Sequence, residues 1–284
     1  MTSGTTDVGR DIQLWWEDFG DPNDPPVLVH AGATINSMMW DTTLLERLAD
    51  CGYHVFRFDT RDVGRSTLVS PDTPQYSIVD LADDVAALIG ALDLPPVHVV
   101  GYSMGSNVGQ IVAGEHPELV ASLILCAAGA GDPDLPDLTI NRVLAAFLEN
   151  LPTPGASRAD SIARLNSVTS ALQGTAADPE LDATDGTVVY DHNADPDHTD
   201  RHVFSGGIEA VVDARVKIRC PTLIMMGGED DPAQGRRLAE SIPGARYVEI
   251  AGHAHNMLMP STLDLFATAF IDHWTTADKQ PIGD

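Results

Sequence analysis

The chain contains almost no lysine. Among its 284 residues only Lys217 and Lys279 carry an ammonium group, and 42 acidic residues outnumber 16 basic ones. The formal net charge of −26 opposes binding to phosphate backbones and to anionic membrane surfaces, so we expect neither nucleic acid nor a membrane as a partner. The glycine-rich fingerprints that cradle phosphates or dinucleotides are also missing, and we expect no cofactor.

Long hydrophobic runs and cysteines are scarce as well. The longest apolar run, 119–128, is far shorter than a membrane helix and is typical of a buried strand. Residues 1–10 are polar and do not resemble a signal peptide. Cys51, Cys126 and Cys220 are odd in number, widely spaced and in or beside apolar stretches. We therefore expect reduced, buried thiols in a cytoplasmic protein.

Strand-like and helical patterns alternate along most of the chain. Apolar runs typical of strands occupy 12–19, 27–30, 54–58, 97–100 and 221–226, and helical spacing occupies 42–49 and 78–92. This alternation with short links predicts an α/β fold with a mainly parallel sheet flanked by helices. In such sheets the catalytic loops follow the carboxyl ends of the strands.

The alternation stops in the middle of the chain. Helical spacing appears at 140–148 and 157–172, whereas 175–200 is acidic and poorly periodic. A structureless loop of this length inside a compact domain would be unusual. We therefore predict a core formed by 1–131 and 212–284, with 132–211 inserted as a helical lid.

The most informative motif is the pentapeptide 101–105, Gly-Tyr-Ser-Met-Gly, which follows an apolar strand and opens a helix. In that context it predicts a nucleophile elbow, a sharp turn that exposes the hydroxyl of Ser103. The small residues Gly101 and Gly105 permit the tight turn. The amide of Met104, at the start of the following helix, is a natural donor to an oxyanion.

A serine needs a base to take its proton and an acid to orient that base. The acid candidates are Asp230 and Asp231, which follow the strand at 221–226. The base candidates are His253 and His255. The order serine, acid, histidine is the one expected of α/β-hydrolases.

Other histidines favour structural roles. His192, His198 and His202 lie among aspartates, but their spacing matches no closed zinc site, so we expect an acidic loop and no metal. His30 is expected to be a hydrogen-bonded structural histidine.

The whole constellation resembles the α/β-hydrolase family, and more narrowly its aclacinomycin methylesterase-like branch. The matching segments are 14–24 (LWWEDFGDPND), 59–66 (DTRDVGRS), 97–105 (VHVVGYSMG), 221–232 and 252–255. The resemblance implies that His255 is the base. It also favours Asp231 over Asp230 as the acid, through the family's Gly-Glu-Xaa-Asp-Pro pattern.

The resemblance further places the second oxyanion donor in the loop after the strand at 27–30, at Ala31 or Gly32, and we choose Gly32 to act with Met104. A small residue there lets a substrate carbonyl approach the backbone. We expect Ala33, Trp40 and Tyr102 to contact the substrate.

By resemblance the protein is a serine-dependent carboxylic ester hydrolase that forms an acyl-enzyme. Its expected substrate is a small-to-medium ester, such as a methyl ester, or a lactone. The alternatives on the same residues are C–C bond hydrolysis and cofactor-free, haloperoxidase-like chemistry. A further alternative is a ligand-binding scaffold without turnover, because the loop at 232–236 is shorter than in relatives and a triad depends on its geometry.

Overall fold

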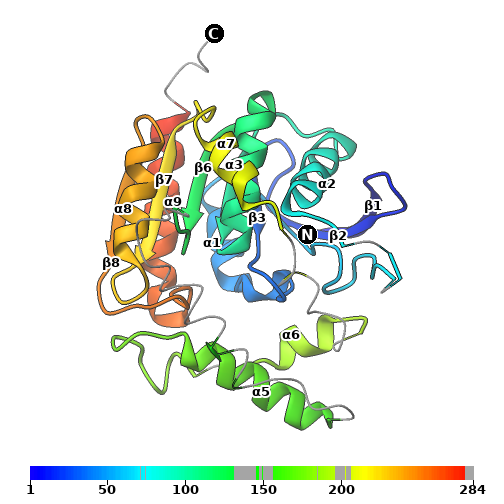
Figure 1. Ribbon diagram of the computed structural model, residues 1–284, viewed down its shortest axis with the longest axis vertical. Coiled ribbons are helices and arrows are strands. Elements are labelled where there is room, and N and C mark those ends of the chain that lie inside the picture. The colour runs from blue at the N-terminus through cyan, green and yellow to red at the C-terminus, as the bar shows by residue number, and fades with distance from the viewer. Residues whose placement is uncertain are drawn as a thin grey trace.

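The computed structural model describes residues 1–70, 72–73, 75–130, 145–146, 149, 156–183, 185–195, 202 and 206–278. Its core is a sheet in which eight strands of the described chain follow the order β1-β2-β4-β3-β5-β6-β7-β8 (Figure 1). The strands are β1 (Ser3–Asp7), β2 (Gln13–Phe19), β3 (Pro26–His30), β4 (His54–Phe58), β5 (Val97–Tyr102), β6 (Val120–Cys126), β7 (Thr222–Gly227) and β8 (Arg246–Ile250).

Most of this sheet is parallel. Strands β4, β3, β5, β6, β7 and β8 pair in parallel, and β2 runs antiparallel to both of its neighbours, β1 and β4. The predicted α/β class with a mainly parallel sheet is confirmed. Because parallel strands end at one edge, the loops after β3, β5 and β7 meet there.

Strand β1 was not recognised in the sequence. Its residues are polar and alternate between exposed and half-buried, as on a sheet edge that lies mainly in water. Pairing with β2 holds it, and the indole of Trp16 packs beside Gly4 and donates a hydrogen bond to Thr6 (2.8 Å). Strand β1 is therefore stabilised by its neighbouring strand, and its own sequence has no apolar pattern that would predict it.

Helices cover both faces of the sheet. The α-helices whose bounds lie within the described residues are α1 (Thr42–Asp50), α2 (Ile78–Ala91), α3 (Met104–Glu115), α5 (Arg158–Ala171), α6 (Thr187–His192), α7 (Ile208–Arg215), α8 (Pro232–Ser241) and α9 (Leu263–Ala277). One buried cluster joins the sheet to α2, α3, α7 and α8, and a second joins its other face to α1 and α9. Strand β5 contributes to both clusters, with Val99 on one face and Val100 on the other. Because β5 is buried on both faces, its sequence at 97–100 is a mainly apolar run instead of an alternating pattern.

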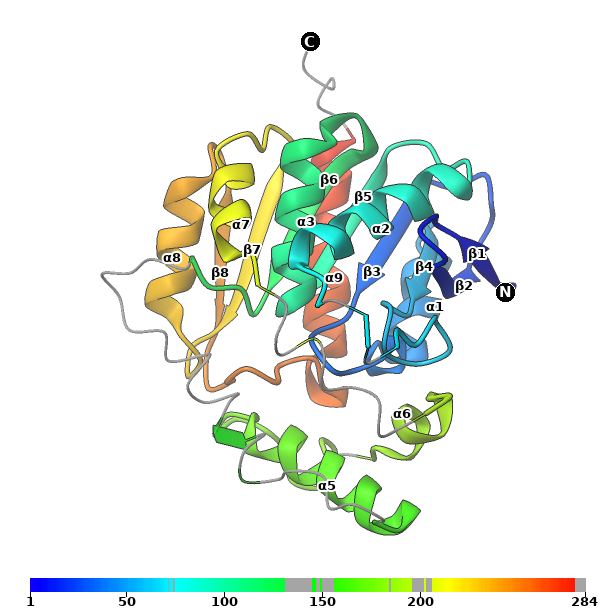
Figure 2. The same cartoon turned by 45° about the vertical axis from the view of Figure 1, so that its right-hand side comes forward.

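Helices α5 and α6 lie apart from these layers, beyond the carboxyl ends of the strands (Figure 2). Helix α7 belongs to the core instead, because Val211 and Ala214 are fully buried against α3. The lid boundary predicted at 211 falls inside α7. The predicted helical segment 140–148 lies almost entirely outside the described residues, and the division into core and lid stays a prediction.

The cysteines only partly follow expectation. Cys126 is buried, Cys220 is half-buried, and all three thiols are free. Cys51, predicted to be buried, is exposed because it caps the end of α1 at the surface. Burial raises the pKa of Cys220 to about 11 and raises that of Cys126 further, which keeps both thiols protonated and unreactive.

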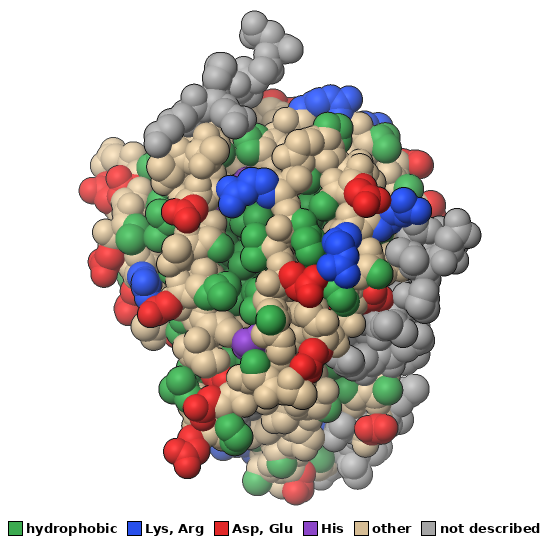
Figure 3. Space-filling view, turned by 90° about the vertical axis from the view of Figure 1, so that its left-hand side faces the viewer, with side chains coloured by type: hydrophobic (Ala, Val, Ile, Leu, Met, Phe, Trp, Pro, Cys, Tyr) green, Lys and Arg blue, Asp and Glu red, His purple; other side chains and the backbone are tan. Residues whose placement is uncertain are grey.

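The surface reflects the acidic composition. Acidic side chains are scattered over the face shown in Figure 3, and several lie beside basic groups rather than in one patch. No helix in the described part of the chain is long and apolar enough to cross a membrane.

Candidate active site

Ser103 occupies a strained turn between β5 and α3. Its backbone angles are φ 54° and ψ −116°, in the region that side-chain-bearing residues rarely adopt. The turn is held by hydrogen bonds from the Ser103 amide to the Cys126 carbonyl (2.9 Å) and from the Ser106 hydroxyl to the carbonyls of Gly101 and Cys126 (both 2.8 Å). The surrounding structure therefore fixes a conformation that would cost about 1–3 kcal/mol.

The two glycines that flank Ser103 permit close backbone packing. A Cβ on Gly101 would lie 2.3 Å from the Gly105 carbonyl oxygen, and one on Gly105 would lie 2.5 Å from the carbonyl oxygen of His30. Neither position tolerates a side chain without moving backbone. Through these contacts the first turn of α3 lies directly against the ends of β5 and β3.

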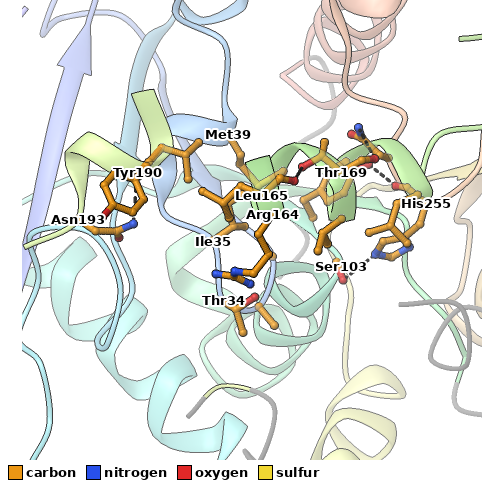
Figure 4. Close-up of a pocket in the computed structure, with 17 residues that line it drawn as sticks. Thr34, Ile35, Met39, Ser103, Arg164, Leu165, Thr169, Tyr190, Asn193 and His255 are labelled. Carbon is orange, nitrogen blue, oxygen red and sulfur yellow. Dashed lines mark hydrogen bonds between the residues drawn. The ribbon is translucent and has the colours of Figure 1, made fainter. Parts of the chain in front are cut away.

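His255 lies between the serine and an aspartate. Its Nε2 is 3.0 Å from the Oγ of Ser103 (Figure 4), and its Nδ1 is 3.0 Å from the Oδ2 of Asp230. His255 and Asp230 are 5% and 4% exposed, whereas Ser103 is half-buried. With the Nδ1 proton donated to the carboxylate, Nε2 is the acceptor for the serine proton.

The sequence-based preference for Asp231 as the partner of His255 is wrong. Asp231 is the N-cap of α8, and its carboxylate accepts a hydrogen bond from the amide of Gln234 (3.3 Å). Helix α8 begins at Pro232, directly after Asp231. The capping role therefore falls to the aspartate directly before Pro232, and Asp230 faces His255.

Tyr102 holds the loop that carries His255 through two hydrogen bonds. Its hydroxyl donates to the carbonyl oxygen of His255 (2.5 Å) and accepts from the amide of Met257 (3.0 Å). Burial is the main cause of a strongly raised pKa for this phenol, so it remains a donor. The residue before the elbow serine thus positions the loop that carries the base.

Both predicted oxyanion donors lie beside Ser103. Gly32, in the loop after β3, lines the same pocket, and a Cβ there would be 3.4 Å from the Cβ of Ser103. Met104 is the first residue of α3, where amides have no acceptor within the helix. Their action on an oxyanion remains a prediction.

A pocket of about 140 Å³ opens above Ser103. Its walls come from the loop after β3, the elbow, the histidine loop, α5 and α6. They comprise Gly32, Ala33, Thr34, Ile35, Met39, Tyr102, Ser103, Arg164, Leu165, Val168, Thr169, Leu172, Val189, Tyr190, Asn193, His255 and Asn256.

Two of the three predicted substrate contacts, Ala33 and Tyr102, line this pocket. The third, Trp40, does not, because it is fully buried beneath Tyr102 with their ring centroids 6.2 Å apart. Met39 lines the pocket instead.

The lining residues of α5 and α6 were missed. One signal existed for α5, because Arg164, Val168 and Leu172 recur every four residues and so share one face of the helix predicted at 157–172.

The remaining histidines attach loops to the core. The Nε2 of His192, on α6, is 2.7 Å from Asp59, and His202 accepts from the amide of Thr34 (3.0 Å) and donates to the carbonyl of Arg61 (2.6 Å). His198 lies outside the described residues.

His30 contacts Thr60 (2.9 Å), and burial, followed by the charge of His202, lowers its pKa to about 3. His253 is nearly buried, with Nδ1 3.0 Å from the carbonyl of Ala251. Within the described ranges no group of three His, Cys, Asp or Glu side chains is arranged to hold a metal ion.

A strained elbow serine, a histidine and an acid on three loops of a mainly parallel sheet define the site of an α/β-hydrolase. A model of the alpha/beta hydrolase fold matches residues 25–262, and the chain belongs to that family. The predicted family resemblance is thereby confirmed.

Individual relatives are similar along nearly the whole chain. The rhodomycin D methylesterases of Streptomyces sp. (strain C5) and Streptomyces peucetius are 29% and 28% identical over 273 and 271 residues, which cover 86% of this chain and 89% of each relative. The crystal structure of the enol-lactonase from Burkholderia xenovorans LB400 superposes with a TM-score of 0.71 at 25% identity, covering 95% of this chain and 99% of the other.

Proposed function

We propose that this chain is a serine-dependent carboxylic ester hydrolase with Ser103, His255 and Asp230 as its catalytic triad. The proposal is carried by one observation, the two successive hydrogen bonds of 3.0 Å from Ser103 to His255 and from His255 to Asp230. A serine hydroxyl becomes nucleophilic when a base with a fixed tautomer takes its proton. The methylesterase relatives support the same class of reaction.

The reaction follows from these contacts. Ser103 attacks the ester carbonyl while His255 takes its proton at Nε2, and the Asp230 carboxylate stabilises the resulting imidazolium. The imidazolium returns the proton to the departing alcohol, which leaves an acyl-enzyme on Ser103. Water then attacks this acyl group with His255 again as the base, and the carboxylic acid product is released.

The tetrahedral intermediate of each half-reaction carries a negative oxygen. The amides of Gly32 and Met104 are the proposed donors to it, and the N-terminus of α3 adds a favourable partial charge. Loss of one such donor typically costs about 10²–10³ in kcat.

The substrate we propose is a small-to-medium ester, such as a methyl ester, or a lactone. Apolar side chains of α5 and α6, including Leu165, Val168 and Val189, line the same pocket as Ser103. Such walls favour a substrate with a hydrophobic body. The relatives named for methyl ester and enol-lactone substrates support this class.

The test combines turnover with covalent labelling. Wild type is expected to hydrolyse p-nitrophenyl acetate and butyrate and to react with a fluorophosphonate probe, and Ser103→Ala is expected to lose both activities. A folded wild type that neither turns over esters nor accepts the probe would refute the proposal and favour the ligand-binding scaffold.

A further inference from the structure

The active-site pocket contains one permanently charged side chain among its described lining residues, that of Arg164 on α5. In Figure 4 its guanidinium extends from α5 toward Thr34, on the loop that also supplies Gly32. Several neighbouring walls are apolar, among them Ile35, Leu165 and Val168. A cation in such surroundings interacts more strongly with a ligand anion than the same group would in water.

Positive charge is rare in this chain, and Arg57, Arg61 and Arg158 are not among the residues that line the pocket. Arg57 pairs with Glu17, and Arg61 with Asp84, both at 2.5 Å and both largely buried. Arg158, on the same helix as Arg164, pairs with Asp191 of α6. Arg164 differs from these in its place, because it faces the space in which a substrate would lie.

The position of Arg164 relative to Ser103 is fixed by the attachment of α5. At the end of the helix, the carbonyl of Leu172 accepts a hydrogen bond from the amide of Asn256 (2.7 Å), the residue after His255. Midway along the helix, the side chain of Asn166 accepts from the amide of Gly186 (2.7 Å), just before α6.

Arg164 lies eight residues before Leu172, which places it roughly 12 Å along the helix axis from the histidine loop. From there its side chain extends back toward Thr34 in the pocket (Figure 4).

We propose that Arg164 determines specificity by binding a carboxylate of the substrate, on a part of the molecule other than the scissile ester. The substrate class is then an ester or lactone that also carries a free carboxylate. This inference rests on the proposed ester hydrolase function. The guanidinium supplies two parallel N–H donors that match the two oxygens of a carboxylate.

The overall charge of −26 does not decide this preference. Charges separated from the pocket by more than a Debye length of about 8 Å are largely screened at physiological ionic strength, whereas a pair inside an apolar pocket is screened much less. Repulsion of an anionic substrate by the net charge of the protein acts equally on two variants that each lack one arginine. A comparison between two such variants therefore isolates the contact of one arginine with the substrate.

The experiment uses matched p-nitrophenyl esters of increasing chain length. For each length, one substrate is the monoester of a dicarboxylic acid, such as adipic or suberic acid, and its partner has the free carboxylate capped as an N-methylamide. The measured quantity is the ratio of kcat/KM for the acid to kcat/KM for its capped partner, at fixed ionic strength. Wild type, Arg164→Gln, Arg164→Lys and Arg158→Gln are compared, and circular dichroism establishes that each is folded.

In wild type the ratio is expected to exceed one for at least one chain length. Arg164→Gln should lower it by about 10–100-fold, mainly through KM, as expected for the loss of a charge-assisted pair. Arg164→Lys keeps the charge without the fork and should give an intermediate ratio.

Arg158→Gln removes an equal charge from the same helix, but from an exposed pair with Asp191, and should leave the ratio unchanged. Adipate itself should inhibit hydrolysis of a neutral ester by wild type, and less so by Arg164→Gln.

The outcomes separate the two proposals. If wild type hydrolyses the esters but prefers the capped partner at every length, or if Arg164→Gln and Arg158→Gln give the same ratio, the role of Arg164 is refuted and the ester hydrolase stands. If folded wild type hydrolyses no ester and is not labelled at Ser103, the ester hydrolase is refuted and this inference with it.

Discussion

Replacing each of the two adjacent aspartates by asparagine tests the assignment of the triad acid directly. In Asp230→Asn the amide can present an N–H to Nδ1 of His255, 3.0 Å away from the present carboxylate. The imidazole would then carry its proton on Nε2, where it can no longer accept the proton of Ser103. A wrong tautomer of this kind costs about 10³–10⁴ in kcat, or about 4–5 kcal/mol of barrier.

Asp231→Asn is the matched control. Asparagine caps helices as well as aspartate does, so α8 should begin normally and kcat should stay within about threefold of wild type. Asp231→Ala removes the cap and should lower the free energy of unfolding by about 1 kcal/mol, or Tm by about 2–4 °C, with the triad intact.

The assay is p-nitrophenyl butyrate turnover together with thermal unfolding followed by circular dichroism. Asp230 should control the rate and Asp231 the stability. Loss of turnover in Asp231→Asn, with Asp230→Asn active, would refute the reasoning.

Three further changes probe the surroundings of the site. Tyr102→Phe removes the donor to the carbonyl of His255 and should lower kcat about tenfold by loosening the base; wild-type kinetics would contradict this role. Gly114→Ala places a Cβ 2.3 Å from the backbone of α7 and should lower the free energy of urea unfolding by about 1–3 kcal/mol. Gly90→Ala is the control, because the space around Gly90 is open, and it should not lower the free energy of unfolding. The pKa of His30 is about 3 in the folded protein and about 6.5 in the unfolded chain, so the free energy of unfolding should fall as pH decreases below 6.5. By pH 5 this histidine alone should lower the free energy of unfolding by about 2 kcal/mol. The variant His30→Gln should lose less stability over the same pH range, as measured by urea unfolding.

The features that were predicted correctly depend on short stretches of sequence. The elbow requires an apolar strand, a serine between two glycines and a helix, all within 97–115, and each part has its own local signal. The alternation of strands and helices likewise predicts a parallel sheet without knowledge of any distant contact. Helix α2 illustrates this, because Leu81, Val85 and Leu88 are spaced for one face and are all buried.

The triad acid could not be assigned from the sequence, because the two candidate aspartates are adjacent and the choice depends on the exact residue at which α8 begins. Asp230 and Asp231 have the same chemistry, and only the start of α8 decides which of them caps the helix. Helix ends are the least predictable part of a helix from sequence. Trp40 was misplaced for a related reason, since a large apolar residue next to a site fits a pocket wall and the core beneath it equally well.

The pocket walls of α5 and α6 could not be identified, because distant contacts place these helices over the site. The amide of Asn256 reaches the carbonyl of Leu172, and the amide of Ala176 reaches the carbonyl of Gly252 (2.8 Å). No local pattern encodes contacts between residues about 80 positions apart. Sequence periodicity therefore indicated that α5 exists, but not what it faces.

The same contacts join substrate selection to catalysis. The segment after α5 is packed against the histidine loop so closely that a Cβ on Gly174 would lie 2.1 Å from the carbonyl oxygen of Gly252. The amide and hydroxyl of Thr175 both donate to the carboxylate of Glu229, the residue before Asp230. A displacement of α5 that reshapes the pocket must therefore also move the loops that carry the base and the acid. His255 Nε2 and Ser103 Oγ must stay within hydrogen-bonding distance. We therefore expect substitutions of pocket side chains on α5 to change specificity with less loss of rate than substitutions that displace the helix.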